Sequence, residues 1–112
     1  MKRVEAYIQP FMLTRGLHEL REAHVHGLTV SDARGFGREK DESYPHHASD
    51  YAVDFTPKVK IEILCRDEDV ERLVETLVIG AHTGRRGDGK VFVTAVESVV
   101  SIRNRETGDD AI

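Results

Sequence analysis

Cysteine, basic excess and long apolar runs are all scarce in this sequence, and each scarcity excludes a class of protein. Cys65 is the one cysteine among 112 residues, which excludes an internal disulfide framework and a cysteine-built zinc site. The formal charge of −4 provides no basic excess of the kind that holds DNA or RNA, so nucleic acid is not an expected partner. The N-terminal residues MKRVEAYIQPF lack the apolar run of a signal peptide, so we expect a cytoplasmic protein without direct membrane insertion.

The chain nevertheless contains enough apolar residues for one folded domain. Hydrophobic residues make up 39% of it and charged residues 32%, a composition that is neither low-complexity nor polar enough for wholesale disorder. A length of 112 residues accommodates a single domain, residues 1–112.

The spacing of apolar residues predicts six elements of secondary structure. Four segments alternate between apolar and polar residues, as half-buried strands do: residues 3–9, 28–36, 58–65 and 91–96. Apolar residues at intervals of three and four predict a first helix over residues 12–25, and a second helix that starts at an N-cap, Asp67, and stops at Gly80. On the second predicted strand, we expect Leu28, Val30 and Ala33 to point into the core.

The order of these elements predicts the fold class. Strand, helix, two strands, helix and strand form the βαββαβ arrangement of α+β ferredoxin-like domains, in which two helices cover one face of a four-stranded antiparallel sheet. The other face stays open, and its expected residues Tyr7, Leu64 and Phe92 are not all polar. We therefore expect the open face to pack against other copies of the chain.

A long polar segment separates the second and third predicted strands. Residues 37–57 form a connection of 21 residues, far longer than a hairpin needs. Within residues 38–50, Tyr44 and Ala48 alone are apolar, so burial cannot stabilise an ordered loop. We expect a projecting arm that orders on contact with a ligand or partner; a passive disordered insertion is the alternative. The C-terminal tail, residues 104–112, is also too polar to belong to a core without a partner.

Glycines cluster in residues 82–90, HTGRRGDGK. Closely spaced glycines let backbone N–H groups turn toward phosphate oxygens, while Lys and Arg neutralise the phosphate charge. Gly84, Gly89 and Lys90 match the G-x-x-x-x-G-K spacing of a P-loop, but Val91 stands where Ser or Thr would hold magnesium, and a strand follows where that motif needs a helix. The segment therefore indicates either a phosphate-binding loop of another kind or an ordinary glycine-rich turn.

Six histidines raise the question of a metal site. His46 and His47 are adjacent in the predicted arm and lie near acidic residues that could close with them around a divalent ion. His24 and His26 have neither a glutamate at helical spacing nor a cysteine partner, so structural or solvent roles are favoured. No specific set of nucleophile, base and orienting residue can be composed from the sequence, so a non-catalytic protein is expected.

The chain contains four motifs in a particular order: GLTVSDARGFGR (27–38), YAVDFTPKVKIEI (51–63), TGRRGDGKVFV (83–93) and IRNRETGDDAI (102–112). Together they resemble the PII signal-transduction family over nearly the full chain. The resemblance implies a homotrimer of ferredoxin-like subunits with ATP or ADP in each intersubunit cleft, and a projecting T-loop, residues 37–57, that docks onto target proteins. It also implies a regulator that senses 2-oxoglutarate beside Mg-ATP.

The same resemblance assigns roles to individual residues. Nucleotide binding is carried over to a set of matching positions: Thr29, Gly35, Gly37, Arg38, Glu62, Leu64, Thr83, Gly87, Asp88, Gly89, Lys90 and Arg103. Glu39 and Lys58 match effector-binding positions, and Glu39 stands where the family places a ligand of the ATP-bound magnesium. Tyr51 matches the tyrosine that some bacterial members have uridylylated.

Some positions depart from the family pattern. Glu39 replaces a glutamine, and its carboxylate would either bind magnesium more strongly or repel dianionic 2-oxoglutarate, which puts classical 2-oxoglutarate sensing in doubt. His46 and His47 replace the tyrosine and arginine of members that regulate ammonium channels, which indicates a different transporter or an enzyme as the target. Ser101 replaces an arginine that grips phosphates, which leaves more of that role to Arg103. A small trimeric metal-binding module using the two loop histidines is the alternative function.

Overall fold

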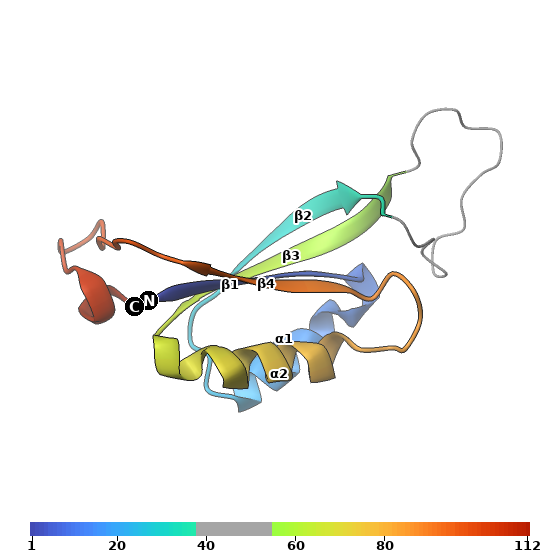
Figure 1. Cartoon of the computed structure of the whole chain (residues 1–112), viewed down its shortest axis with the longest axis horizontal. Helices are drawn as coiled ribbons and strands as arrows, with labels where there is room; N and C mark the ends of the chain where they lie inside the picture. The colour runs from blue at the N-terminus through green and yellow to red at the C-terminus, as the bar shows by residue number, and fades with distance from the viewer. Residues whose placement is uncertain (38–54) are drawn as a thin grey trace.

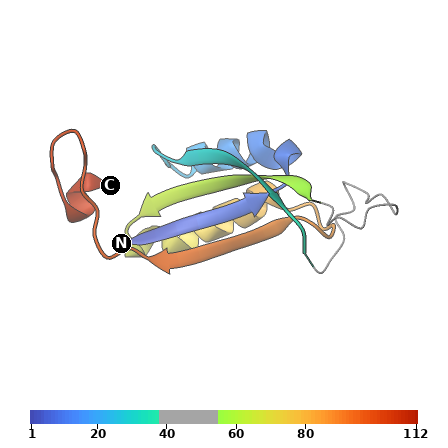
Figure 2. The ribbon, with the colours of Figure 1, turned by 90° about the horizontal axis from the view of Figure 1, so that it is seen from above.

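Four antiparallel strands form one sheet in the order β2-β3-β1-β4, and two helices lie against one of its faces (Figures 1 and 2). This computed structural model describes residues 1–37 and 55–112. The strands are β1 (Lys2–Ile8), β2 (Thr29–Gly35), β3 (Thr56–Cys65) and β4 (Gly89–Ala95), and the helices are α1 (Leu13–Glu22) and α2 (Val70–Ala81). Short 3-10 turns occur at Pro10–Met12, Asp67–Asp69 and Gly108–Ala111. The predicted α+β ferredoxin-like fold class is confirmed.

The core forms between the helices and one face of the two central strands. Val4, Ala6 and Ile8 alternate on β1 and are at most 2% exposed, and Ile61 on β3 is completely buried. The β1–β3 register pairs Ala6 with Ile61, which places both side chains on this covered face. The helices contribute buried leucines, among them Leu77. The period-two prediction for β1 and β3 is therefore confirmed.

Gly80 allows the close approach of the two helices. Gly80 is buried within α2, and a Cβ built on it would approach the backbone Cα of Gly16 on α1 at 3.0 Å. The expectation that Gly80 stops the second helix is wrong, because α2 continues to Ala81 and the chain becomes extended at His82. The glycine is needed for close helix packing rather than for a turn.

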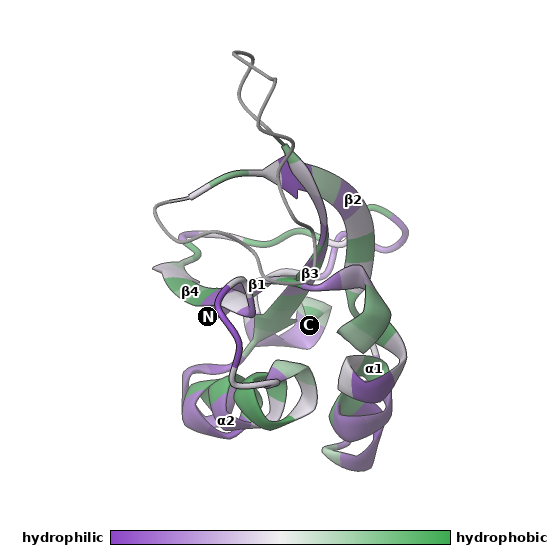
Figure 3. Ribbon diagram, turned by 90° about the vertical axis from the view of Figure 1, so that its right-hand side faces the viewer, coloured by the Kyte–Doolittle hydropathy of each residue, from purple (hydrophilic) through white to green (hydrophobic). Residues whose placement is uncertain are grey.

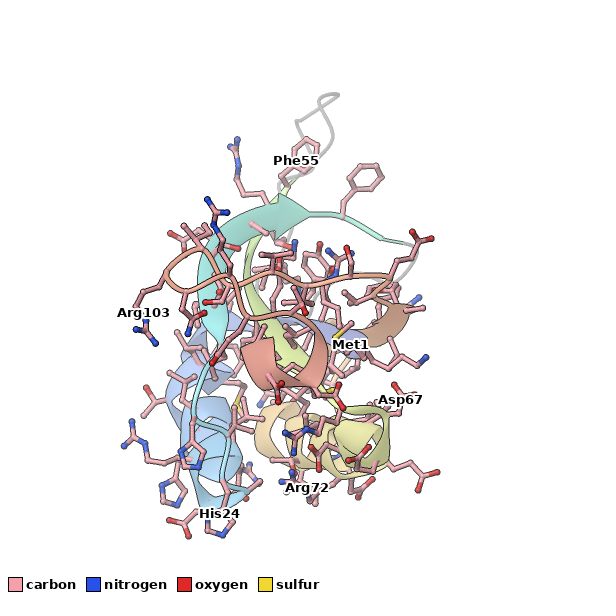
Figure 4. All side chains as sticks on the ribbon, turned by 90° about the vertical axis from the view of Figure 1, so that its left-hand side faces the viewer. Met1, His24, Phe55, Asp67, Arg72 and Arg103 are labelled. Carbon is pink, nitrogen blue, oxygen red and sulfur yellow. The ribbon has the colours of Figure 1, made fainter. Side chains whose placement is uncertain are left out.

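Asp67 does not cap the second helix as expected. It begins a 3-10 turn, and the residue that precedes α2 is Asp69, whose side chain makes no capping hydrogen bond. The carboxylate of Asp67 instead accepts a 2.9 Å hydrogen bond from the amino group of Met1 (Figure 4). That hydrogen bond, with the nearby charge of Lys2, lowers the pKa of Asp67.

The first helix ends earlier than the sequence predicts, at Glu22 rather than at Val25. His24 adopts φ 64°, a left-handed conformation that breaks the helix. Arg72 of α2 donates to the carbonyl oxygen of Ala23, and this hydrogen bond ties the end of α1 to the second helix (Figure 4). Val25 still packs against the core, half-buried, from the loop that follows.

Strand β2 lies at one edge of the sheet and is poorly covered (Figure 2). Ala33 pairs with Lys58, so it faces the open side and not the core, contrary to expectation. Val30 pairs with Ile61 on the covered side, but it is 39% exposed because no further strand flanks it. Leu28 does pack against the core.

The C-terminal tail leaves β4 and lies near the N-terminus (Figure 1). A single bridge between Val100 and Thr107 closes a loop in which Ile102 is fully exposed. In the portion of the chain that the structure covers, no helix is both long and apolar enough to cross a membrane.

Candidate functional site

A groove of about 920 Å³ opens on the uncovered side of the sheet, where β2 ends and β4 begins. Seven of the residues predicted to bind nucleotide or effector line it: Gly35, Gly37, Lys58, Gly87, Asp88, Gly89 and Lys90. They come from the end of β2 and the residues just after it, from β3, and from the glycine-rich segment that leads from α2 into the first residues of β4. The fold thus brings together three segments that are far apart in the sequence.

Asp88 organises the first half of the glycine-rich loop. Its carboxylate accepts hydrogen bonds from the backbone N–H groups of Thr83 and Gly84, at 2.8 and 2.9 Å, and from the hydroxyl group of Thr83. Burial raises the pKa of the Asp88 carboxyl, but these hydrogen bonds outweigh it and keep the net pKa below its usual value. Asp88 therefore remains ionised and fixes the loop from within.

The loop joins β4 at Gly89, and any other residue at this position would be strained. Gly89 has φ 106°, and a Cβ there would overlap the backbone carbonyl of Tyr7. Gly84 and Gly87 also have positive φ values, 89° and 98°. These conformations are accessible to glycine at little cost, which explains the glycine spacing that the sequence shows.

The second half of the loop is held through one carbonyl group. The carbonyl oxygen of Gly87 accepts hydrogen bonds from Nζ of Lys58 and from Nε2 of Gln9, both at 2.7 Å. Gln9 was not among the predicted site residues, because a lone glutamine between a strand and Pro10 matches no binding motif.

Positive charge dominates the described lining of the groove. Its cationic side chains are Arg34, Lys58, Arg85, Arg86 and Lys90. Asp88 is the one carboxylate among the lining residues that the structure covers, and its oxygens already accept hydrogen bonds from the loop. Such a groove attracts a polyanion. The arginines of residues 82–90 were predicted to neutralise phosphate charge, although Arg85 and Arg86 were not named as site residues, and nothing in the sequence placed Arg34 beside the loop.

The remaining predicted nucleotide residues within 1–37 and 55–112 do not line this groove. Thr29 pairs with Glu62, four residues along β3 from Lys58, which corresponds to roughly 13 Å along an extended strand. Leu64 lies further along the same strand, and Arg103 points outward from the tail loop (Figure 4). Thr83 is outside the lining but bonds to Asp88. Within one chain, the predicted residues that the structure describes therefore include one group at the groove and a second group along β3, around Thr29, Glu62 and Leu64.

Between these groups, the open face carries a network of charged side chains. Lys60 lies 2.6 Å from Glu62 and 3.8 Å from Glu5, and Arg3 lies 2.7 Å from Glu5. The hydrogen bond between Lys60 and Glu62 raises the pKa of the lysine and lowers that of the glutamate.

Aromatic pairs flank the groove. Tyr7 and Phe92 line its floor in an edge-to-face contact, with ring centroids 6.1 Å apart. Phe36, which directly precedes the long connection, and Phe55, near the end of that connection, form a second such pair at 5.5 Å; both are more than half exposed, and Figure 4 labels Phe55.

The predictions of metal ligands and of a modified tyrosine concern residues that the structure does not describe, whereas the one thiol lies within the described part of the chain. Arg38, Glu39, His46, His47 and Tyr51 all lie outside the described residues. Across residues 1–37 and 55–112, no three histidine, cysteine or carboxylate side chains converge as a metal site requires. Cys65 is buried, and this burial raises the pKa of its thiol, as expected for a small core residue.

Comparison with known proteins decides the family. The family model described as nitrogen regulatory protein P-II matches residues 1–106. The chain belongs to the P-II family. Nitrogen regulatory protein P-II of Azospirillum brasilense is 51% identical, and that of Rhizobium meliloti 47% identical, each over the full length of both chains.

A solved structure supports the same assignment. The crystal structure of Arabidopsis thaliana PII bound to citrate has a TM-score of 0.81 with this chain at 36% sequence identity, and the match covers 99% of this chain and 91% of that one. This P-II chain is therefore a member of a nitrogen regulatory, signal-transducing family.

The hydropathy pattern of the chain agrees with the fold, since apolar segments of both helices lie next to the sheet (Figure 3).

Proposed function

We propose that this P-II protein is a non-catalytic cytoplasmic regulator. It binds ATP or ADP in clefts between subunits of a homotrimer, and it controls a target protein through the T-loop, residues 37–57. The observation that carries the proposal is the groove itself, where glycine backbone and five cationic side chains surround a hollow of about 920 Å³. This combination suits a nucleotide polyphosphate better than a neutral metabolite.

The separation of the predicted residues into two groups supports a trimer. Lys90 and the glycine-rich loop lie at one end of the open face, and Glu62 and Leu64 lie at the other. In one chain the two groups do not face each other across a cleft, and neighbouring copies related by symmetry would place the groove of one against the opposite end of the next. Exposed apolar side chains on β4, such as Phe92 at 46% exposure, support burial of this face by other copies.

A small carboxylate is the proposed second ligand. Lys58 lines the groove, where its ammonium can meet a carboxylate group. The Arabidopsis relative is described as bound to citrate, which supports a polycarboxylate beside Lys58 in this protein too. Glu39, the proposed magnesium contact, determines whether that effector is 2-oxoglutarate or another anion. Ligand occupancy would select one arrangement of the T-loop, and hence binding or release of a target transporter or enzyme.

Calorimetric titration of ATP and ADP with Mg²⁺, with and without 2-oxoglutarate, tests the proposal. We expect saturable nucleotide binding that Lys90→Ala abolishes while light scattering still shows a trimer. Lys2→Ala is the matched control, because Lys2 lies at the opposite end of β1 from the groove, next to Asp67. Absence of nucleotide binding by the unchanged chain, or equal loss in both variants, would reject the proposed function.

A further inference from the structure

Gln9 is a fully buried polar residue that contacts the glycine-rich loop. It directly follows β1 and is 0% exposed, and its Nε2 donates the 2.7 Å hydrogen bond to the carbonyl oxygen of Gly87. A buried amide is costly unless it forms hydrogen bonds, so this contact fixes both the side chain and the loop.

The carbonyl group of Gly87 receives two donors of unequal mobility. A carbonyl oxygen has two lone pairs, which Gln9 and Lys58 can occupy together. Gln9 is locked in the core, whereas Lys58 is half-buried, lines the groove and carries its ammonium at the end of a flexible stem. An anion in the groove therefore competes with Gly87 for Lys58 but not for Gln9.

The orientation of the Gly87 peptide group depends on these two donors, because a glycine backbone has little steric constraint of its own. Its φ of 98° lies in a region that glycine enters freely, so sterics alone do not fix the orientation of its peptide group. The carboxylate of Asp88 contacts Thr83, Gly84 and His82, on the other side of the loop, and not the Gly87 carbonyl. A Gly87 carbonyl that turned into the groove would direct partial negative charge at an incoming anion.

We propose that Gln9 is a positioning residue for anion binding in this groove. It keeps the Gly87 carbonyl in place while Lys58 transfers its ammonium from that carbonyl to a phosphate or carboxylate of the ligand. The inference rests on the proposed function for the nature of the ligand, whereas the contacts of Gln9 stand independently of it.

A double-mutant cycle without ligand tests these contacts. Gln9→Leu and Lys58→Met each remove one donor and keep similar side-chain size, and the double variant removes both. We expect the thermal midpoint of the double variant to fall by more than the two single falls combined, because the carbonyl then loses both donors. A fall in the thermal midpoint of the double variant that equals the sum of the two single falls would overturn the inference.

Calorimetry with ATP and Mg²⁺ tests the positioning role. Gln9→Leu is expected to weaken ATP binding roughly three- to tenfold, the size of one lost hydrogen bond. Thr76→Ala is the matched control, because it removes a 2.7 Å hydrogen bond to a backbone carbonyl on α2, away from the groove, and should leave ATP affinity unchanged. Equal affinity of Gln9→Leu and the unchanged chain would overturn the inference.

The Lys58→Met background separates positioning from general loop damage. In this background Gln9 is the remaining one of the two donors to the Gly87 carbonyl, so adding Gln9→Leu should weaken ATP binding by a larger factor than it does in the unchanged chain. An equal loss in both backgrounds would indicate a merely structural role and overturn the inference. If the unchanged chain binds no ATP, the proposed function fails, and the ligand-free cycle still decides whether Gln9 and Lys58 share the carbonyl.

Discussion

The covered and open faces of the sheet carry opposite chemistry, although the same strands build both. On the covered face, Ala6 and Ile61 pair with no exposure, and close packing decides which side chains fit. One residue along, on the open face, Glu5 pairs with Glu62, and Lys60 lies between the two carboxylates. Stability therefore resides on the covered side of this sheet, whereas the open side carries the charged side chains on which the proposed ligand binding depends.

Ile61→Ala is expected to have the largest effect on stability. It would leave a cavity at a completely buried position and cost about 2–5 kcal/mol of unfolding free energy, measured by denaturant titration. If Ile61→Ala lowered the unfolding free energy by less than the substitutions on the open face do, the conclusion that the covered face provides the stability would be wrong.

The contact between helices tests how closely the covered side is packed. Gly80→Val would drive a branched side chain against the backbone of α1, and we expect a loss of roughly 1–3 kcal/mol in the same titration. Gly16→Ala is the matched control: its Cβ would meet only Ile8, at 3.7 Å, so higher helix propensity should raise stability by about 0.5–1 kcal/mol. Equal losses in the two variants would contradict the role given to Gly80.

Asp88→Asn addresses the groove on the open side. Removing the charge weakens the hydrogen bonds from Thr83 and Gly84, with an expected loss of roughly 1–3 kcal/mol near neutral pH. Because the folded pKa of Asp88 lies below its ordinary value of 3.8, the stabilisation is complete above that pH and disappears as the pH falls through the folded pKa.

Thermal unfolding of both chains as a function of pH measures this difference. The two midpoints should converge in strong acid. A gap between the midpoints that stays constant with pH would contradict the assignment of an ionised Asp88.

Lys60→Met should have the smallest effect. The ion pair with Glu62 lies on an exposed face, where such pairs contribute little to stability, so we expect an unchanged unfolding midpoint. The pKa of Glu62, followed by nuclear magnetic resonance, should rise toward its usual value because its main partner has gone. An unfolding midpoint lowered as far as in Ile61→Ala would show that the open face is part of the core.

Much of the fold was predictable because apolar periodicity is a local property. The alternation in β1 and β3 predicted which residues are buried, and the element order predicted the α+β class. The predictions failed where a distant partner decides the outcome. Asp67 forms a hydrogen bond with the chain's own N-terminus instead of capping a helix, and Ala33 faces the open side because its strand pairs with β3 in that register.

The candidate site divides in the same way. The glycine spacing of residues 82–90 by itself indicated either a phosphate-binding loop or an ordinary glycine-rich turn, and the motif order indicated the family. Both signals are local, because they depend on residues that are neighbours in the sequence. Only the tertiary structure brought Arg34, Lys58 and Lys90 around one groove, and only it placed Gln9 against Gly87. The reason is physical: composition and periodicity determine which surfaces a chain must bury, whereas strand register determines which distant side chains then meet.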